Sequence, residues 1–163
     1  MTKKVFKVLF VCTGNSCRSP MAEGILKKML RDKGMSHIEV QSAGTMPPYQ
    51  MQPTSYALIT SLEQGVDISS YRSKDLTKSL IEEADLILVM EEAHRRFIRN
   101  LTNAADSKVF LLKSFGQDKK ESGLEIEDPI GMDIEFYRSC YDELEYEIKR
   151  ILPLIEKMAA KTS

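Results

Sequence analysis

The sequence is short of the residues on which several protein classes depend. It contains only three cysteines and two histidines in 163 residues. Such a sparse and odd set of cysteines argues against the disulfide framework of a secreted domain and favours a reducing compartment, so we expect a cytoplasmic protein. His37 and His94 lie far apart, and no Cys-x-x-Cys or His-x-x-x-His spacing occurs. We therefore expect no built-in zinc site.

An excess of positive charge and a long apolar run are also missing. Lysine and arginine together number 23, against 24 aspartates and glutamates, for a net charge of −1. Most proteins that bind nucleic acid or anionic membranes carry a basic excess, so we expect neither partner. No segment approaches the roughly 20 apolar residues of a membrane span. At this length we expect one domain spanning residues 1–163.

What the sequence does contain is an alternation of short apolar runs and helical patterns. The runs are typical of strands buried in a parallel sheet, and between them apolar residues recur at three- and four-residue steps. The longest helical pattern covers residues 134–161, where Pro153 should introduce a kink or end the regular part. The alternation predicts a doubly wound α/β fold. The predicted strands are Val5–Val11, Ile38–Val40, Leu86–Val89 and Val109–Leu112.

A loop of small residues joins the first predicted strand to the first predicted helix. It runs from Cys12 to Pro20 and contains Arg18 and Ser19. Ligands of doubly wound folds bind beyond the carboxyl ends of the strands. Backbone N–H groups of the loop, the helix dipole and the Arg18 fork can together bind phosphate oxygens, and Ser19 suits the N-cap. The same field favours the thiolate form of Cys12, which makes it a candidate nucleophile.

Other interpretations of this loop make different demands on the sequence. A nucleotide-binding P-loop is excluded because Gly-Lys-Ser/Thr is missing, and a dinucleotide site because the glycine triplet is missing. A purely structural alternative stays open, in which Cys12 is a buried strand-end residue and Arg18 a solvated charge at a helix start.

An aspartate late in the chain can supply the proton that thiolate attack on phosphorus requires for the leaving group. Asp128 precedes Pro129 in a segment between the last strand and the last helix. In a doubly wound sheet that segment emerges at the same edge as Cys12. Taken alone, an Asp-Pro pair would more simply initiate a turn.

Together these motifs resemble the low-molecular-weight protein tyrosine phosphatases, over nearly the whole chain. The resemblance implies a four-stranded parallel sheet flanked by helices, and it requires no metal or cofactor. It implies that Cys12 forms a phosphocysteine, that Arg18 binds phosphate and stabilises the transition state, and that Asp128 acts first as acid and then as base. The matching segments are Val11–Asn15, Arg18–Glu23, Ser42–Thr45, Ala84–Leu86 and Asp128–Pro129.

The same resemblance implies roles for the residues around the nucleophile. Ser19 is similar to the hydroxyl that stabilises the Cys12 thiolate, and Asn15 with Ser42 resembles the pair that braces the loop. Cys17 matches family members in which two cysteines form a reversible disulfide, although a packing role suits it equally well. The implied phosphate-binding loop comprises Thr13, Gly14, Asn15, Ser16, Cys17, Arg18 and Ser19.

The expected substrate pocket, formed by Ser16, Tyr49 and Ile130, departs from the phosphotyrosine pattern. Phosphotyrosine-specific members usually carry a bulky apolar residue at the position of Ser16 and an aromatic pair where this chain has Ile130 and Gly131. Protein arginine phosphatases are similar at both places, since a small hydroxyl can hydrogen-bond a guanidinium. Tyr49 either walls a phosphotyrosine ring or has no role. Phosphotyrosine is preferred as the commoner activity, with phosphoarginine as the alternative.

We expect a monomer that acts on a phosphorylated protein or peptide. A non-hydrolytic phosphocysteine carrier would need neither Arg18 nor Asp128, and an arsenate reductase would need relay cysteines, which residues 80–90 lack. Cys140 is expected in the core, on the apolar face of the last helix. His94 is expected on a solvated helix face, without a role.

Overall fold

The fold is built on one parallel sheet, in a computed structural model that describes residues 4–117 and 123–162. Within these residues four strands pair in the order β2-β1-β3-β4, which confirms the predicted four-stranded doubly wound class. The elements in chain order are β1 (Phe6–Cys12), α1 (Arg18–Asp32), β2 (Ile38–Gly44), α2 (Ser55–Glu63), α3 (Lys78–Glu83), β3 (Leu86–Val89), α4 (Glu92–Leu101), the 3-10 turn η1 (Asp106–Lys108), β4 (Val109–Leu111) and α5 (Ile134–Lys161).

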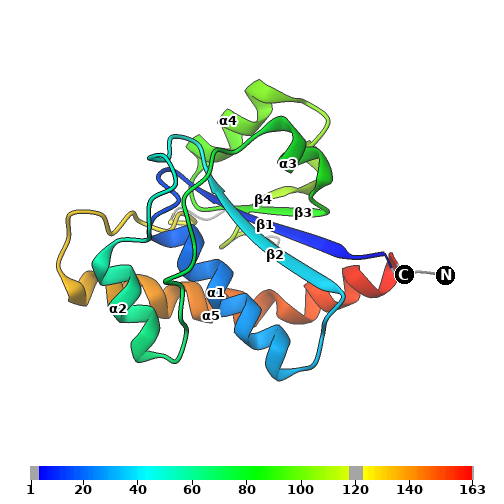
Figure 1. Cartoon of the computed structure of the whole chain (residues 1–163). Helices are drawn as coiled ribbons and strands as arrows, with labels where there is room; N and C mark the ends of the chain where they lie inside the picture. Colours follow the sequence, from blue (N-terminus) through cyan, green and yellow to red (C-terminus); the bar gives the residue numbers. More distant parts are fainter. Residues whose placement is uncertain (1–3, 118–122, 163) are drawn as a thin grey trace.

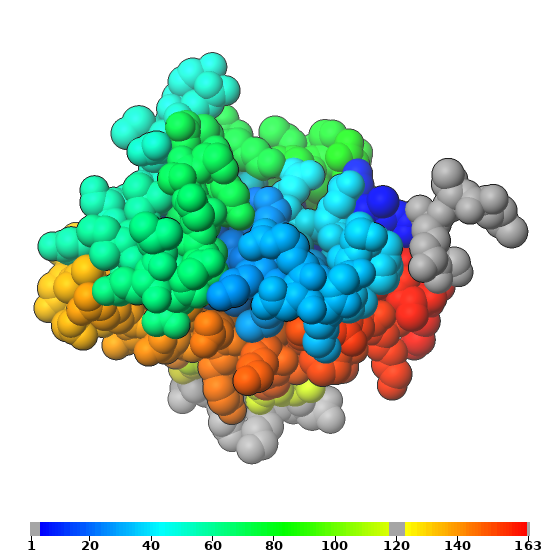
Figure 2. All heavy atoms as spheres, turned by 60° about the horizontal axis from the view of Figure 1, so that its bottom comes forward, coloured from blue at the N-terminus to red at the C-terminus, as the bar shows by residue number. Residues whose placement is uncertain are grey.

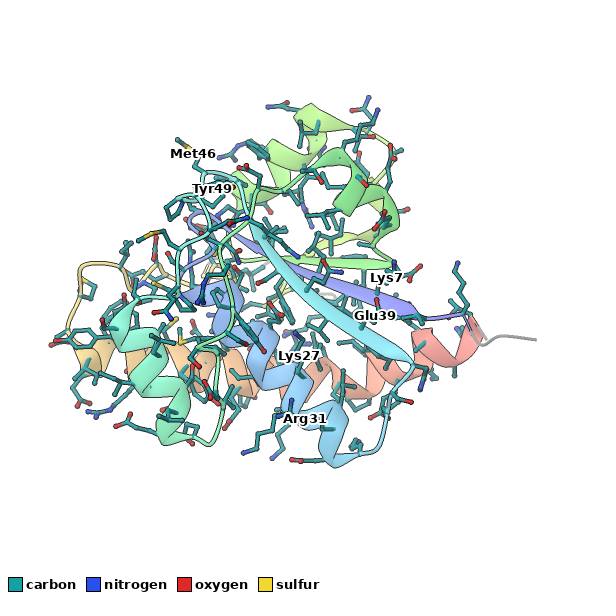
Figure 3. The ribbon with its side chains drawn as sticks, viewed as in Figure 1. Lys7, Lys27, Arg31, Glu39, Met46 and Tyr49 are labelled. Atoms are coloured by element: carbon teal, nitrogen blue, oxygen red, sulfur yellow. The ribbon has the colours of Figure 1, made fainter. Side chains whose placement is uncertain are left out.

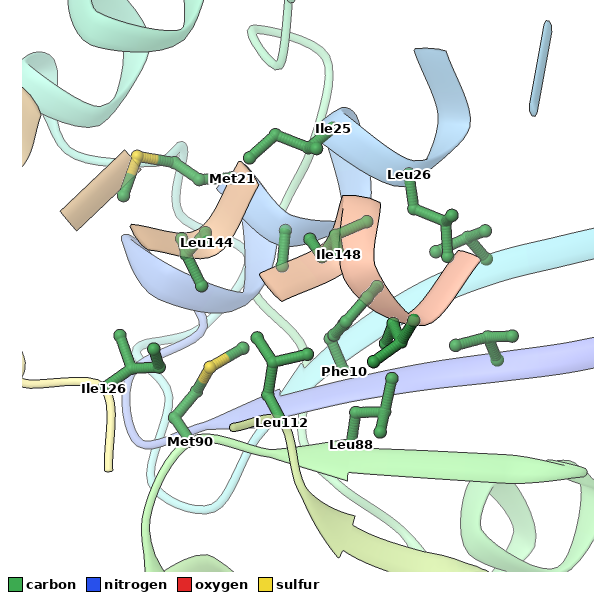
Figure 4. Packing of buried hydrophobic residues seen from close by; sticks show 14 of the residues in the cluster. Phe10, Met21, Ile25, Leu26, Leu88, Met90, Leu112, Ile126, Leu144 and Ile148 are labelled. Carbon is green, nitrogen blue, oxygen red and sulfur yellow. The ribbon is translucent and has the colours of Figure 1, made fainter. Parts of the chain in front are cut away.

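Helices cover both faces of this sheet, with α1 and α5 on one side and α3 and α4 on the other (Figure 1). Side chains alternate along β1, so Phe10 faces the core under α1 and α5 while Val11 faces the core under α3 and α4. Figure 4 shows Phe10 and Leu88 packing towards Leu144 and Ile148 of α5. Two buried faces explain why the strands are apolar at nearly every position.

The strand order reverses next to β1, because β2 and β3 lie on its opposite sides. In the parallel register Val11 is paired with Ala43 of β2 and with Val89 of β3. The loops that follow these three strands therefore leave from one edge of the sheet, at the switch point where ligands of such folds bind. The segment before Asp128 joins them there, since the N–H of Ile126 donates to the carbonyl of Met90 at 2.9 Å.

The first helix begins earlier than the sequence predicts, whereas the last helix has the predicted range. The first begins at Arg18 with Cys17 at its N-cap, and not after Ser19, because the Ser19 side chain bonds to Cys12 and cannot cap. The last helix spans Ile134–Lys161, as its periodicity predicts, and it continues through Pro153. Buried side chains on both sides of the proline hold its turns against the sheet, which offsets the lost hydrogen bond.

The last helix is a long, partly exposed element. Figure 2 shows α5 running beneath α1 and α2 along the side of the molecule. A bidentate ion pair fastens its first turns to α2, because Arg138 donates to both carboxylate oxygens of Glu63 at 3.1 and 2.6 Å.

Across residues 4–117 and 123–162, no helix has both the length and the apolarity that a membrane crossing needs.

Candidate active site

One asparagine holds the loop between β1 and α1 in place at the end of β1. Asn15 is buried and adopts a left-handed backbone conformation with φ of 50°, which asparagine tolerates better than most residues. Its Nδ2 donates to Ser19 Oγ at 2.8 Å and to Ser42 Oγ at 2.9 Å, and its Oδ1 accepts from the Lys74 N–H at 3.0 Å. Ser42 donates onward to Glu23 at 2.6 Å. The loop is thereby tied to β2, to α1 and to the segment before α3.

Cys12 lies at the floor of this loop, at the end of β1. Its Sγ is 2.9 Å from Ser19 Oγ. Because Ser19 Oγ already accepts a hydrogen bond from Asn15, its own hydrogen is available to the sulfur. A sulfur at the floor of the cavity, with a hydroxyl at hydrogen-bonding distance, is placed as a nucleophile would be.

Arg18 is 1% exposed and is held by groups from two segments, one after β3 and one before α5. Its Nη1 donates to Glu91 Oε2 at 2.6 Å and to the carbonyl of Ile126 at 2.7 Å, and its Nη2 lies 3.5 Å from Asp128 Oδ2. Burial works to lower the pKa of Arg18, but the negative charges of Cys12, Glu91 and Asp128 outweigh it, and the pKa is raised. The Nε atom is buried without a hydrogen-bond partner among the described residues, so the guanidinium retains a donor for a ligand.

Asp128 stands at the rim, where it is partly open to water. Its Oδ1 accepts from the Ile130 N–H at 3.1 Å, which fixes the turn after Pro129 and leaves Oδ2 directed towards Arg18. The predicted nucleophile, arginine and aspartate thus converge on one cavity of about 330 Å³. The cavity is lined by Cys12, Thr13, Gly14, Ser16, Cys17, Arg18, Met46, Pro48, Asp128 and Ile130.

The substrate side of this cavity differs in part from the expected pocket. Ser16 and Ile130 line it, but Tyr49 is 86% exposed and is absent from the lining. Figure 3 shows Met46 and Tyr49 on the loop after β2, and in Figure 2 the turquoise segment around residues 45–50 stands out from the surface. Met46 and Pro48, from the same loop, line the cavity instead. The sequence did not indicate this, because a loop has no periodicity that shows which side chains face a cavity.

The prediction for His94 is wrong, because its side chain is buried and not solvated. His94 is 2% exposed, and its Nε2 lies 2.9 Å from Thr13 Oγ1. Burial and the nearby charge of Arg18 lower the pKa of His94 to about 4, so the imidazole is neutral. Glu91, the partner of Arg18, was also missed. A signal existed, since Glu91 follows a buried strand at the same sheet edge as Cys12.

Two further thiols lie near or beneath the site. Cys17 is buried, and its Sγ is 3.3 Å from both Thr54 Oγ1 and Tyr137 Oη. Burial raises the pKa of Cys17. Cys140 packs in the core as expected, and burial raises its pKa to about 12. All three cysteines are free.

A Cys-x5-Arg loop at the carboxyl edge of a doubly wound sheet defines the class of this protein as an α/β phosphatase. The sequence profile of the Low molecular weight phosphotyrosine protein phosphatase family matches residues 7–162. The chain belongs to this family, whose members act on phosphorylated proteins.

Relatives of both substrate types are similar to this chain. It is 33% identical over 150 residues to the Protein-arginine-phosphatase of Bacillus subtilis, covering 92% of this chain and 97% of that protein. It is also 33% identical over 141 residues to the human Low molecular weight phosphotyrosine protein phosphatase, covering 82% and 87%.

Solved structures agree with the fold. A YwlE arginine phosphatase mutant with a phosphorylated active-site serine matches with a TM-score of 0.86 at 32% identity, over 93% of this chain and 97% of that one. The Low Molecular Weight Protein Tyrosine Phosphatase from T. tengcongensis matches with a TM-score of 0.82 at 37% identity, over 91% and 98%.

Proposed function

We propose that this phosphatase hydrolyses phosphorylated protein side chains through a phosphocysteine on Cys12, without a metal ion. The convergence of Cys12, Arg18 and Asp128 on one cavity is the observation that carries this proposal. A relative with a phosphorylated active-site serine supports it, because a serine at the nucleophile position retained the phosphoryl group in that protein.

The reaction has two displacement steps. In the first, the Cys12 thiolate attacks phosphorus, the bond to the leaving group breaks, and Asp128 donates its proton to the departing atom. In the second, the Asp128 carboxylate takes a proton from water as the oxygen attacks phosphorus. The sulfur–phosphorus bond breaks, inorganic phosphate leaves, and the thiolate is restored.

The loop stabilises the charge that develops during both steps. Its backbone N–H groups, the start of α1 and the Arg18 guanidinium surround the phosphoryl oxygens. Arg18 is paired with Glu91 and Asp128, and within residues 4–117 and 123–162 its buried Nε has no hydrogen-bond partner. Bound phosphate supplies that partner. Asn15 and Ser42 keep the loop rigid, so little reorganisation is needed in the transition state.

Phosphotyrosine is the substrate we propose first. A cavity of about 330 Å³ with Met46, Pro48 and Ile130 on its walls offers apolar contact to a phenyl ring. Phosphoarginine is the second candidate, favoured by Ser16 in the lining of the same cavity and by similarity to protein-arginine-phosphatases. A guanidinium gains a hydrogen-bond partner from a hydroxyl, whereas a phenyl ring does not.

The deciding experiment compares kcat/KM for two peptides of identical sequence, one with phosphotyrosine and one with phosphoarginine, in the presence of a chelator. We expect turnover of phosphotyrosine to be the faster. The Ser16→Ile variant is the matched test of the pocket, since it should reduce turnover of phosphoarginine and spare phosphotyrosine. Faster turnover of phosphoarginine by the native protein would reverse the assignment, and no turnover of either would favour a phosphocysteine carrier.

We also propose that the protein works in the cytoplasm as a monomeric single domain, with neither nucleic acid nor membrane as a partner. The net charge of −1 supports the exclusion of nucleic acid as a partner. Three free, buried cysteines are consistent with a reducing compartment. Sedimentation at micromolar concentration tests the oligomeric state.

A further inference from the structure

Both ring nitrogens of His94 make hydrogen bonds, one to Glu91 and one to Thr13. The Glu91 N–H donates to Nδ1 at 3.1 Å, so Nδ1 carries no proton. In the neutral ring the proton is therefore on Nε2, which donates to Thr13 Oγ1 at 2.9 Å. A buried histidine with two satisfied nitrogens and a fixed tautomer is held in one orientation.

The two partners of His94 belong to two parts of the proposed site. Thr13 directly follows Cys12, lines the cavity and accepts the Met46 N–H at its carbonyl at 2.9 Å. Glu91 holds Arg18 through a bond of 2.6 Å. One imidazole thus couples the first residue after the nucleophile to the residue that orients the arginine.

We propose that His94 is a positioning residue for phosphate binding, which acts by holding Thr13 through its Nε2–H donor. This inference rests on the proposed function, because it assigns the residue to the same loop. The Thr13 hydroxyl is held by the hydrogen bond from His94 Nε2, so losing this donor removes a restraint on the side chain and on the backbone between Cys12 and Gly14. Misplacement of a loop that surrounds phosphate weakens binding of the anion and slows transfer.

A purely structural role for His94 would work through its other nitrogen. Nδ1 and the Glu91 side chain complete a capping box at the start of α4, and loss of that box would destabilise the helix. Two substitutions separate the roles. His94→Gln places an amide N–H near the Nε2 position and keeps a donor for Thr13, whereas His94→Asn places an oxygen near the Nδ1 position and keeps only the capping acceptor.

The experiment measures kcat and KM for p-nitrophenyl phosphate, together with the thermal midpoint. We expect His94→Asn to lower kcat about tenfold with a midpoint close to the native one, and His94→Gln to stay within about threefold in kcat. Thr13→Val should lower kcat as much as His94→Asn does. The double variant should be no slower than either single variant, because both substitutions remove the same hydrogen bond. His37→Asn, at the opposite end of the sheet, is the matched control.

A second readout needs no turnover. Inorganic phosphate protects Cys12 from alkylation by iodoacetamide when it occupies the loop, and the protection gives a Kd. We expect this Kd to rise about tenfold in His94→Asn and to be nearly unchanged in His94→Gln. The inference would be overturned if His94→Asn and His94→Gln had equal Kd values for phosphate. It would also be overturned if the double variant lost the product of the kcat losses of Thr13→Val and His94→Asn. If the native protein binds phosphate but turns over no substrate, the proposed function fails while the role of His94 is still decided by Kd.

Discussion

The phosphate loop and the mouth of the cavity are built in opposite ways. In the loop, Arg18, Asn15 and Ser19 are buried and each is held by several hydrogen bonds. At the mouth, Met46 is 77% exposed and Asp128 38%, on segments that follow the strands. The contrast indicates that recognition of the phosphoryl group is preorganised, whereas contact with the rest of the substrate is made by adaptable side chains.

The strongest test of this contrast removes the nucleophile without disturbing the loop. Cys12→Ser should lower kcat by about 10⁴-fold or more, since a hydroxyl at this position is not ionised, while inorganic phosphate still binds. Steady-state turnover and calorimetric phosphate binding measure the two effects. Turnover close to that of the native protein would remove Cys12 from the mechanism.

Removing the acid at the rim should give a smaller loss that depends on the substrate. Asp128→Ala is expected to slow a phenyl phosphate by about 10²- to 10⁴-fold, because a phenol with a pKa of about 10 leaves poorly without a proton. An activated nitrophenyl phosphate should be affected much less. Comparing the two substrates checks the assignment, which an equal loss for both would contradict.

Loosening the loop should cost stability as well as rate. Asn15→Ala removes three hydrogen bonds, two of them buried, and places a less tolerant residue at a positive φ, so we expect a destabilisation of about 2 kcal/mol or more. Asn15→Gly is the control, because glycine accepts the backbone angle and loses only the bonds. Urea unfolding of both variants separates the two contributions.

The neutral buried histidine predicts a loss of stability in acid. The pKa of His94 is about 4 in the folded protein, set by burial and by Arg18, against 6.5 as its ordinary value. Between these values the unfolded chain takes up a proton that the folded chain does not, so stability falls as pH falls from 6.5 towards 4, by about 3 kcal/mol in all. Glu91 and Asp128 oppose this shift without cancelling it. Urea unfolding at pH 7.5 and pH 5 should show the loss, and His94→Gln should reduce it.

The smallest effects are expected at the mouth. Met46→Ser removes an exposed apolar contact, so we expect a rise of about two- to fivefold in KM for a phosphopeptide and little change in kcat. Tyr49→Ser, on the same loop but outside the cavity lining, is the matched control. A larger loss for Tyr49→Ser would mean that the loop closes over bound substrate and brings Tyr49 to the pocket.

The deep part of the site is more predictable from the sequence than its surroundings are. The run from Cys12 to Ser19 is a local motif, and placing it after a buried strand was enough to indicate a phosphate cradle. The six-residue helix α3 was not predicted, because so short a segment has little periodicity. His94 was misjudged because it stands among charged residues, in the stretch Glu91–Arg96, of which His94 is the one buried residue.

What the sequence by itself determined is the alternation of strands and helices, the position of the Cys12 loop at a strand end, and the phosphatase class, since each depends on spacing within a short stretch of chain. The sheet edge shared by Asp128 and Cys12 also follows from the predicted strand order, whereas only the tertiary structure decided that Glu91 and His94 meet the loop as well. Glu91 and His94 follow β3, and Asp128 follows β4, yet parallel pairing brings all three to the end of β1. The buried contacts between them exist only once the sheet has formed, because the hydrogen bonds and charges that define the site act over a few ångströms and not along the sequence.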